Sequence, residues 1–317
     1  MIGRQVVTYV VALLVASLII FMLVNLLPGD VAGTILGTNA DAQSIAELRG
    51  RLGLDRPWPL RYLEWMGGLV TGNLGTSALS GVSVAAMIAP KLAVTGWLVL
   101  LGMTLSIVIA IPVGVISALR RRHLDGLLVA GMSQIGMAVP AFLAGLLLSV
   151  LFAVKLHWLP ANGYTKLTAD PVEWARHMVL PVVSLAIVQS AVLGRYVRSA
   201  FIDVLNEDYF RTARSIGWPF RAAVARHGLR NAALQVITVL GLELASLFAG
   251  GIVVENVFVL PGMGSLLVST VNQRDLPVVQ GIVMLQVALV LVINGLADLA
   301  YRLLDPRLRD PDQERTL

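Results

Sequence analysis

Charged residues are absent from long stretches of this chain, and these stretches define its architecture. Between Gln5 and Leu27, for example, there is no Asp, Glu, Lys or Arg. A helix that crosses a bilayer needs about 20 predominantly apolar residues, and in lipid only a helix satisfies the backbone of such a run. The sequence therefore predicts an all-α, polytopic membrane protein with six transmembrane helices. The first lies within 1–27, and the others cover 92–119, 126–154, 177–197, 231–254 and 276–302.

The composition excludes an ordinary soluble domain. Hydrophobic residues make up 57% of the 317 residues and charged residues only 14%, whereas charge in soluble domains is near a quarter of all residues. The net charge of +5 does not indicate a nucleic-acid-binding face, because the excess Arg lies in a few loops between apolar spans. We therefore expect a lipid bilayer, and no nucleic acid, as a partner. The chain has no Cys, which excludes disulfides and thiolate metal sites.

The distribution of arginine predicts the orientation. Three arginines lie between the second and third spans, seven lie between Arg195 and Arg230, and four lie in the C-terminal part from Arg302 onward. Lys and Arg are enriched in cytoplasmic loops, and loops longer than about 60 residues count little. Both termini and the segment 198–230 are therefore predicted to be cytoplasmic.

The loops divide the chain into four parts. The first span is longer than the apolar core of a signal peptide and no Ala-x-Ala site follows it, so 1–27 is predicted to be retained. The segment 28–91 is predicted to be an extracytoplasmic subdomain, since it is too long to lack structure. The five remaining spans form a core over 92–302 that includes the cytoplasmic loop 198–230, and 303–317 is a polar cytoplasmic tail.

Local signals add detail to this plan. A short helix is predicted over 42–52, with Asp41 as its N-cap and Gly53 after its end, and a second one over 60–69. The segment 72–75 contains two glycines and predicts a turn. Pro112 and Pro140 fall inside the second and third spans, where proline removes a hydrogen bond and kinks a helix.

One carboxylate interrupts the fifth span. Glu243 lies about halfway along it, where an ionised side chain is costly unless it faces the protein interior or a watery cavity. One interpretation places Glu243 on a substrate pathway that favours cationic cargo. The other is a protonated Glu243 that is hydrogen-bonded to a neighbouring helix, since desolvation favours the neutral carboxyl. The sequence leaves both open.

Motifs for chemistry are missing. The chain contains no Walker A loop, no His-Glu-x-x-His pair and no Gly-x-Ser-x-Gly elbow. The four His residues stand alone, so neither a metal site nor a bound cofactor is expected. These absences predict a transport protein without its own energy source and without enzymatic activity.

The segment 198–230 is the polar, arginine-rich exception between two spans. Asp208 is predicted to be the N-cap of a short helix over 209–216, and Gly217 supplies the residue that ends it. Pro219 is predicted to begin a second short helix that extends to about His227. Two interpretations fit this pattern: helices that lie on anionic lipid headgroups, or an element that docks on a protein partner.

The motif Asp208-Tyr-x-Arg-Thr-Ala-Arg-x-x-Gly217, followed by His227-x-Leu-Arg-Asn231, resembles the cytoplasmic coupling loop of permeases of ABC importers. The chain resembles most closely the dipeptide/oligopeptide/nickel permease family, and the subunit type usually written first of its two permeases. Further matching segments lie in the same order along the chain: Leu27-Pro-Gly-Asp30, Leu52-Gly-Leu-Asp-Arg-Pro57, Leu69-Val-Thr-Gly-Asn-Leu-Gly75, Leu159-Pro-Ala-Asn-Gly-Tyr164, Gly250-Gly-Ile-Val-Val-Glu255, Val257-Phe-Val-Leu-Pro-Gly-Met-Gly264, Arg274-Asp275 and Leu304-Asp-Pro-Arg307.

The resemblance implies a bacterial inner-membrane importer for di- or oligopeptides that works by alternating access. Its partners would be a second homologous permease subunit, two ATP-hydrolysing nucleotide-binding subunits and an extracytoplasmic substrate-binding protein. The motif residues that would couple the ATPase to the spans are Asp208, Tyr209, Arg211, Thr212, Ala213, Arg214 and Gly217. Ser215-Ile216 replaces the usual Ala-Lys of the family, Asn73 replaces its usual Asp, and Glu243 stands where an uncharged amide is expected.

Two alternatives remain at this stage. The same class of importer could carry a nickel chelate, glutathione or another small solute. A stand-alone secondary transporter would need an ion-coupling site and usually shows internal repeats. No repeat between the two halves is visible, and one intramembrane acid is weak support for ion coupling.

Overall fold

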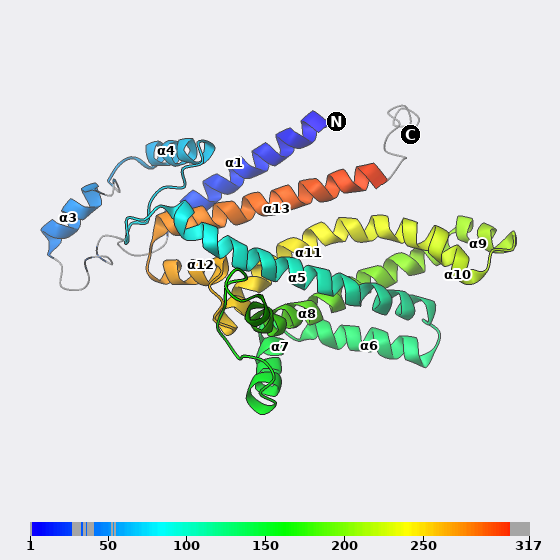
Figure 1. Cartoon of the computed structure of the whole chain (residues 1–317). Coiled ribbons are helices and arrows are strands. Elements are labelled where there is room, and N and C mark those ends of the chain that lie inside the picture. The colour runs from blue at the N-terminus through cyan, green and yellow to red at the C-terminus, as the bar shows by residue number, and fades with distance from the viewer. Residues whose placement is uncertain are drawn as a thin grey trace. The chain divides into compact units, whose positions relative to one another are not determined.

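The computed structural model describes residues 2–26, 41–51, 53 and 55–304, together with Gly33 and Leu36, and within them every regular element is a helix (Figure 1). The motif residues at 27–30 and 305–307, and the tail predicted for 303–317 from residue 305 onward, lie outside the described residues. The chain divides into two compact units, 1–95 with 261–291 and 96–260 with 292–317. The long helices α5 (Val84–Leu119) and α13 (Leu276–Leu304) contribute to both units.

The first unit contains the predicted first span as α1 (Ile2–Leu26) and two short helices, α3 (Ala42–Arg51) and α4 (Trp58–Val70). Helix α4 packs on α1, where the Tyr62 ring meets the Phe21 ring edge-on at 5.4 Å between centroids. The helix α12 (Met263–Asn272) and the first half of α13 complete the unit. Its core is apolar, with Val84, Ile88, Met263, Val278 and Ile282 buried together.

The predicted local signals of the first unit are confirmed. The Asp41 carboxylate accepts a hydrogen bond of 2.6 Å from the Ser44 amide at the start of α3, and Gly53 has a φ of 66° beyond its end. In the predicted turn, the Asn73 side-chain oxygen accepts from the Gly75 amide at 2.9 Å. The family's usual Asp could accept the same bond, so Asn73 preserves the turn.

A buried carboxylate joins two distant parts of the first unit. Asp275 is 2% exposed and precedes α13. It accepts one hydrogen bond from the Ser77 hydroxyl and another, of 3.0 Å, from the Ala78 amide. A buried charge is tolerated when its lone pairs are satisfied in this way. The contact fixes the loop around residue 77 to the start of α13.

The second unit is organised around α8 (Pro171–Asn206), which begins with Asp170 as N-cap. The Asp170 carboxylate accepts hydrogen bonds from the Val172 and Glu173 amides. Helix α8 is the most buried of the five long apolar helices in the described chain. Of its 18-residue apolar stretch, 67% is buried inside the protein. It packs against α6 (Leu124–Ala138), α7 (Ala141–Leu148) and α11 (Leu229–Val257).

The third predicted span, 126–154, is not a single helix. It consists of α6, then α7 continued by the π-helical segment η1 (Ser149–Lys155), and the two parts meet at a bend of 97°. The break lies at Val139-Pro140. Proline lacks an N–H and disfavours helical geometry in the residue before it, and Val139 is extended with a φ of −85° and a ψ of 118°. By contrast, Pro112 lies within the uninterrupted helix α5.

The described residues thus contain five helices that are long and apolar enough to span a membrane, and a sixth span if the bent pair is one crossing. The chain is a multi-pass, all-α membrane protein.

Candidate docking site

Helix α9 (Asp208–Ser215) follows α8 after a single residue. Glu207 is extended, with a φ of −70° and a ψ of 147°, and turns the chain between the two helices. The N-cap is therefore Glu207, and the prediction of Asp208 as N-cap was wrong by one residue. Asp208 is already helical, and its carbonyl accepts a 2.9 Å hydrogen bond from the Thr212 hydroxyl.

The end of α9 matches the prediction for Gly217. This residue has a φ of 95°, which side chains rarely tolerate, and no neighbouring atom lies within 4 Å of the position of a Cβ there. The Trp218 amide donates to the Ala213 carbonyl at 3.2 Å, and the Gly217 amide donates to the Arg214 carbonyl at 3.2 Å. This pair of bonds is the Schellman motif, which satisfies the last carbonyls of a helix. The backbone conformation at this position therefore favours glycine.

The inner face of α9 is apolar. Phe210 and Ala213 are 4% and 6% exposed, and the Phe210 ring meets the Phe220 ring edge-on at 6.0 Å. The Ala213 methyl therefore faces the interior of this chain. The small side chain allows α9 to lie close to its own neighbours.

The outer face of α9 carries the side chains that are available for contact. Tyr209, Thr212 and Ile216 are separated by three and four residues, so they form one stripe on the helix surface, which we call the outer stripe. All three are exposed, and Ile216 is 71% exposed. Ile216 is an exposed apolar side chain at the end of a polar helix. Such a side chain is typical of a surface that a partner protein covers.

The arginines of the segment have different roles. Arg214 donates a 2.6 Å hydrogen bond to the Trp218 carbonyl and lies 5.8 Å from the centroid of the Phe220 ring, so it stabilises the turn after α9. Arg226 lies 5.5 Å from the Trp218 ring. Arg211 is 3.6 Å from Asp208, but both side chains are largely exposed, and such an ion pair contributes little stability.

The second predicted short helix is not separate. Helix α10 (Phe220–Ala223) begins after Pro219, passes through the π-helical turn η2 (Val224–Gly228) and continues into α11. Gly228 has helical angles, with a φ of −70° and a ψ of −55°, so nothing ends the helix before α11. Helix α9 therefore lies along the chain between two long helices, α8 before it and α11 after it.

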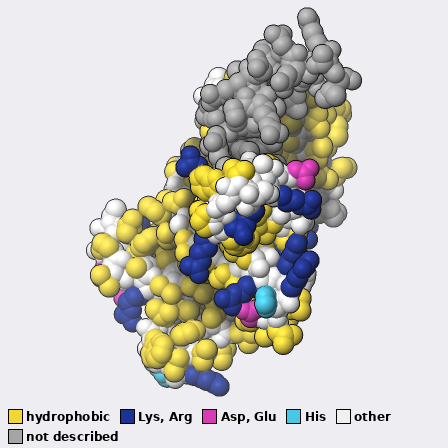
Figure 2. All heavy atoms as spheres, turned by 90° about the vertical axis from the view of Figure 1, so that its right-hand side faces the viewer, with side chains coloured by type: hydrophobic (Ala, Val, Ile, Leu, Met, Phe, Trp, Pro, Cys, Tyr) yellow, Lys and Arg dark blue, Asp and Glu magenta, His cyan; other side chains and the backbone are white. Residues whose placement is uncertain are grey.

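Arginine side chains gather on the face of the second unit that carries α9 and α10 (Figure 2). The turn between α5 and α6 contributes to this face, and its Arg121 donates a 3.2 Å hydrogen bond to the Asn206 side chain at the end of α8. The exposed arginines of the second unit at this end are Arg120, Arg122, Arg195, Arg211, Arg214, Arg221 and Arg226.

Glu243 is not part of this site. It lies about 20 Å along α11 from Leu229, taking 1.5 Å per residue. Its carboxyl group accepts a hydrogen bond from the side chain of Gln189 on α8, a residue that is 5% exposed. Gln189 is not among the residues predicted from the sequence, although an amide within an uncharged span is a signal for such a bond. The contact is compatible with both interpretations of Glu243.

Within the described residues, no group of three or more His, Asp or Glu side chains could hold a metal ion. Those residues form a membrane-spanning bundle and the short helix α9 with its exposed outer stripe.

Comparisons with known proteins agree with this arrangement. The family described as binding-protein-dependent transport system inner membrane component matches residues 110–310. The corresponding N-terminal family of these membrane components matches residues 1–86. The oligopeptide transport system permease protein AppB of Bacillus subtilis is 39% identical over 274 residues, which cover 86% of each chain. The glutathione transport system permease protein GsiC of Pectobacterium atrosepticum is 39% identical over 270 residues, covering 85% of this chain and 86% of the relative.

A solved structure shares the fold. The crystal structure of an amino acid ABC transporter with histidines superimposes with a TM-score of 0.53 and 16% sequence identity, over 69% of this chain and 94% of the other. With both family matches and relatives of this similarity, the chain belongs to the binding-protein-dependent transport system inner membrane components, the permease subunits of ABC importers.

Proposed function

We propose that this chain is one of two permease subunits that together form a pathway for di- or oligopeptides and work by alternating access. Two separate nucleotide-binding subunits would hydrolyse ATP, and an extracytoplasmic binding protein would deliver the cargo. The permease itself would have no enzymatic activity. Family membership supports this assignment, and the name of the relative AppB supports peptide as cargo.

The proposed orientation places both termini and α9 in the cytoplasm of a bacterial cell, with the segment 28–91 on the opposite side. The exposed arginines on the face that carries α9 support it, since arginine favours the cytoplasmic side of a membrane. The nucleotide-binding subunits are cytoplasmic proteins in this proposal, so they would meet the protein at this face.

The shape of α9 is the observation that carries the proposal. Its inner face is fixed by Phe210 and Ala213, its end is fixed by Gly217, and its outer stripe is exposed. We assign partner contact to Tyr209, Thr212 and Ile216, with Arg211 beside them. Asp208, Ala213, Arg214 and Gly217 would shape the helix.

Packing explains how docking could drive transport. Helix α9 lies between α8 and the continuous α10–η2–α11 segment, and α8 and α11 pack closely on each other. A movement imposed on α9 by nucleotide-binding subunits would therefore reach two spans at once. Rigid helices that share a packed interface transmit such movements.

The test is Thr212→Asp in the complete transporter reconstituted in proteoliposomes. The new carboxylate would lie on the exposed outer stripe, so folding and membrane insertion should be retained while cargo-stimulated ATP hydrolysis and uptake fall at least tenfold. Thr168→Asp makes the same substitution in the exposed turn before α8, at the opposite end of this helix from α9, and serves as the matched control. Equal uptake by both variants would show that α9 is not the docking helix.

Glutathione is the second candidate cargo, because the relative GsiC is named a glutathione permease and is as similar to this chain as AppB. Uptake by the reconstituted transporter, measured with a panel of dipeptides, longer peptides and glutathione, would distinguish the two. Preferential uptake of glutathione would replace the peptide assignment and leave the docking assignment intact.

A further inference from the structure

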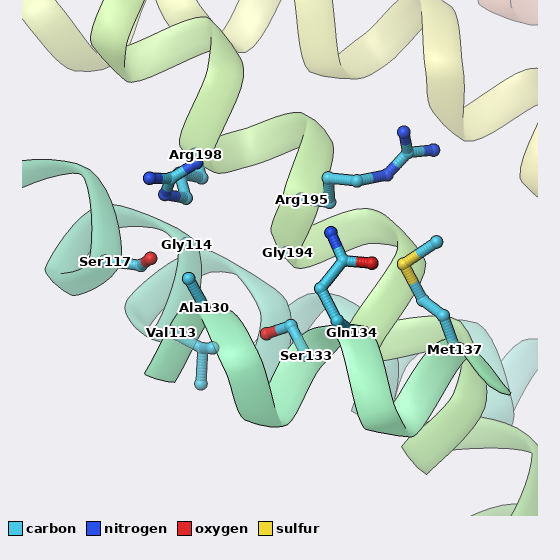
Figure 3. Close-up of a pocket in the computed structure, with 10 residues that line it drawn as sticks. All are labelled: Val113, Gly114, Ser117, Ala130, Ser133, Gln134, Met137, Gly194, Arg195 and Arg198. Carbon is cyan, nitrogen blue, oxygen red and sulfur yellow. The ribbon is translucent and has the colours of Figure 1, made fainter. Parts of the chain in front are cut away.

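A pocket opens between α5, α6 and α8 in the second unit (Figure 3). The pocket is small, with an accessible volume of about 30 Å³. Neither the outer stripe of α9 nor Glu243 contributes to it. The residues that line the pocket are Val113, Gly114, Ser117, Ala130, Ser133, Gln134, Met137, Gly194, Arg195 and Arg198.

The charge of the pocket is positive and uncompensated. Arg195 and Arg198 lie one turn apart on α8, and no acidic residue is among the lining residues. Across the described residues, neither arginine forms an ion pair, and the buried Nε of Arg198 has no hydrogen-bond partner. Because leaving a buried charged donor unpaired is costly, the pocket fits an anion with several acceptor oxygens.

Neutral polar groups line the same space. In Figure 3 the Ser133 hydroxyl and the Gln134 amide extend from α6 toward the space below Arg198, while the Arg195 guanidinium extends toward the Met137 side. Gln134 is exposed, and its amide has no hydrogen-bond partner among the described residues, so its two N–H donors are available to an acceptor. The Ser133 hydroxyl donates to the Val129 carbonyl at 3.1 Å. The donors that border the pocket are therefore Gln134 on α6 and Arg198 on α8.

The position of the pocket along α8 indicates its depth in the membrane. Residues 177–194 of α8 carry no charge, and Arg195 is the first charged residue after them. The pocket therefore lies where the apolar span meets the headgroup region. Its walls include the apolar side chains of Val113, Ala130 and Met137, which suit the carbon atoms next to a headgroup.

We propose that this pocket binds the phosphate group of an anionic phospholipid. Basic pockets between transmembrane helices at the cytoplasmic boundary recognise such headgroups. A free phosphate ion has the same oxygens, but a lipid also supplies apolar atoms for the walls and reaches the site by diffusing within the leaflet. Arg198 would bind the phosphate, with Gln134 as a further donor, while Arg195 would add positive charge at the rim of the pocket.

The experiment is a lipid titration of the purified full-length chain in detergent, followed by native mass spectrometry. Phosphatidylglycerol should bind about tenfold more tightly than phosphatidylcholine, and Arg198→Gln should remove about that factor, as expected when one charged hydrogen-bonding group is lost. Gln134→Glu should weaken binding to a similar extent, because the new carboxylate would pair with Arg198. This exposed, isosteric change tests the site even where Arg198→Gln does not fold.

Arg122→Gln is the matched control, since it removes an exposed arginine that lies outside the pocket, and it should bind phosphatidylglycerol as the unchanged chain does. Equal affinity for the two lipids, or an equal loss in Arg122→Gln, would overturn the proposal. So would displacement of phosphatidylglycerol by millimolar inorganic phosphate, because the natural ligand would then be a free anion. Binding that survives inorganic phosphate supports the lipid.

Discussion

The surroundings of Asp275 in the first unit and helix α9 in the second unit differ in where their hydrogen bonds are made. Around Asp275, a carboxylate that is 2% exposed receives hydrogen bonds from Ser77 and Ala78, so its acceptors are used within the chain. On α9, the hydrogen bonds of Gly217 and Trp218 fix the backbone, while Tyr209, Thr212 and Ile216 remain exposed. Polar groups whose hydrogen bonds are made within the chain stabilise the fold. A rigid helix with an exposed stripe is suited to a partner.

The largest effect is expected from Ala213→Asp. The sequence motif alone predicts selective uncoupling, but this side chain is 6% exposed on the inner face of α9. A buried, unpaired carboxylate costs several kcal/mol, so the loop should unfold locally and the yield of folded protein should fall. Limited proteolysis of the loop 198–230 measures this. Unchanged protease resistance would mean that Ala213 faces outward.

A smaller loss is expected from Asp275→Ala. It leaves the Ser77 hydroxyl and the Ala78 amide without their acceptor, at a cost of about 1–3 kcal/mol for each buried group. The melting temperature of the detergent-purified chain should fall, and Asp275→Asn should restore part of the loss because its oxygen accepts one of the two bonds. If Asp275→Ala melts at the original temperature, the contact does not stabilise the first unit.

Gly217→Ala should cost about 1 kcal/mol, because alanine disfavours the positive φ of 95° while no atom obstructs its methyl group. Thermal unfolding should therefore shift only slightly. Gly251→Ala is the comparison variant, since it has equal space around it but lies in the helix α11, where alanine is favoured. The prediction is wrong if the two variants shift the melting temperature in the same direction by the same amount.

The smallest effect on stability is expected from Glu243→Gln, because an amide oxygen can still accept the hydrogen bond from Gln189. Uptake distinguishes the two interpretations of this residue. If Glu243 lines the pathway, uptake of cationic peptides should fall several-fold relative to neutral ones. Equal rates for both cargo types would leave Glu243 as a structural partner of Gln189.

Much of this architecture could be predicted from the pattern along the chain. The apolar runs predicted α1, α5, α8, α11 and α13 because a span needs a minimum length without charge, whatever its neighbours are. The glycine at 217 predicted the end of α9, because the positive φ is a property of a single residue. Boundaries were predicted less accurately: α8 continues to Asn206, beyond the predicted 197, because Phe201 and Val204 keep a buried face there while Asp203 is exposed.

Other features depend on contacts between residues far apart in the sequence. The proline at 140 predicted a kink, but the bend of 97° between α6 and α7 depends on how each half packs on α8. The Schellman turn and α10 could be anticipated locally, whereas the orientation of Ala213 toward the interior depends on where Phe210 and Phe220 meet. Gln189 and Glu243 are 54 residues apart, and only the packing of α8 on α11 pairs them.

The sequence by itself determined the membrane location, the number of apolar runs, the asymmetry of arginine and the motif on which the docking proposal for α9 depends, because each depends on residue type and spacing alone. Only the tertiary structure decided which face of α9 is exposed, which carboxylates are satisfied, and that Arg195 and Arg198 border one pocket with Ser133 and Gln134. The physical reason is that burial and hydrogen bonding are properties of pairs of elements, and packing alone brings those elements together.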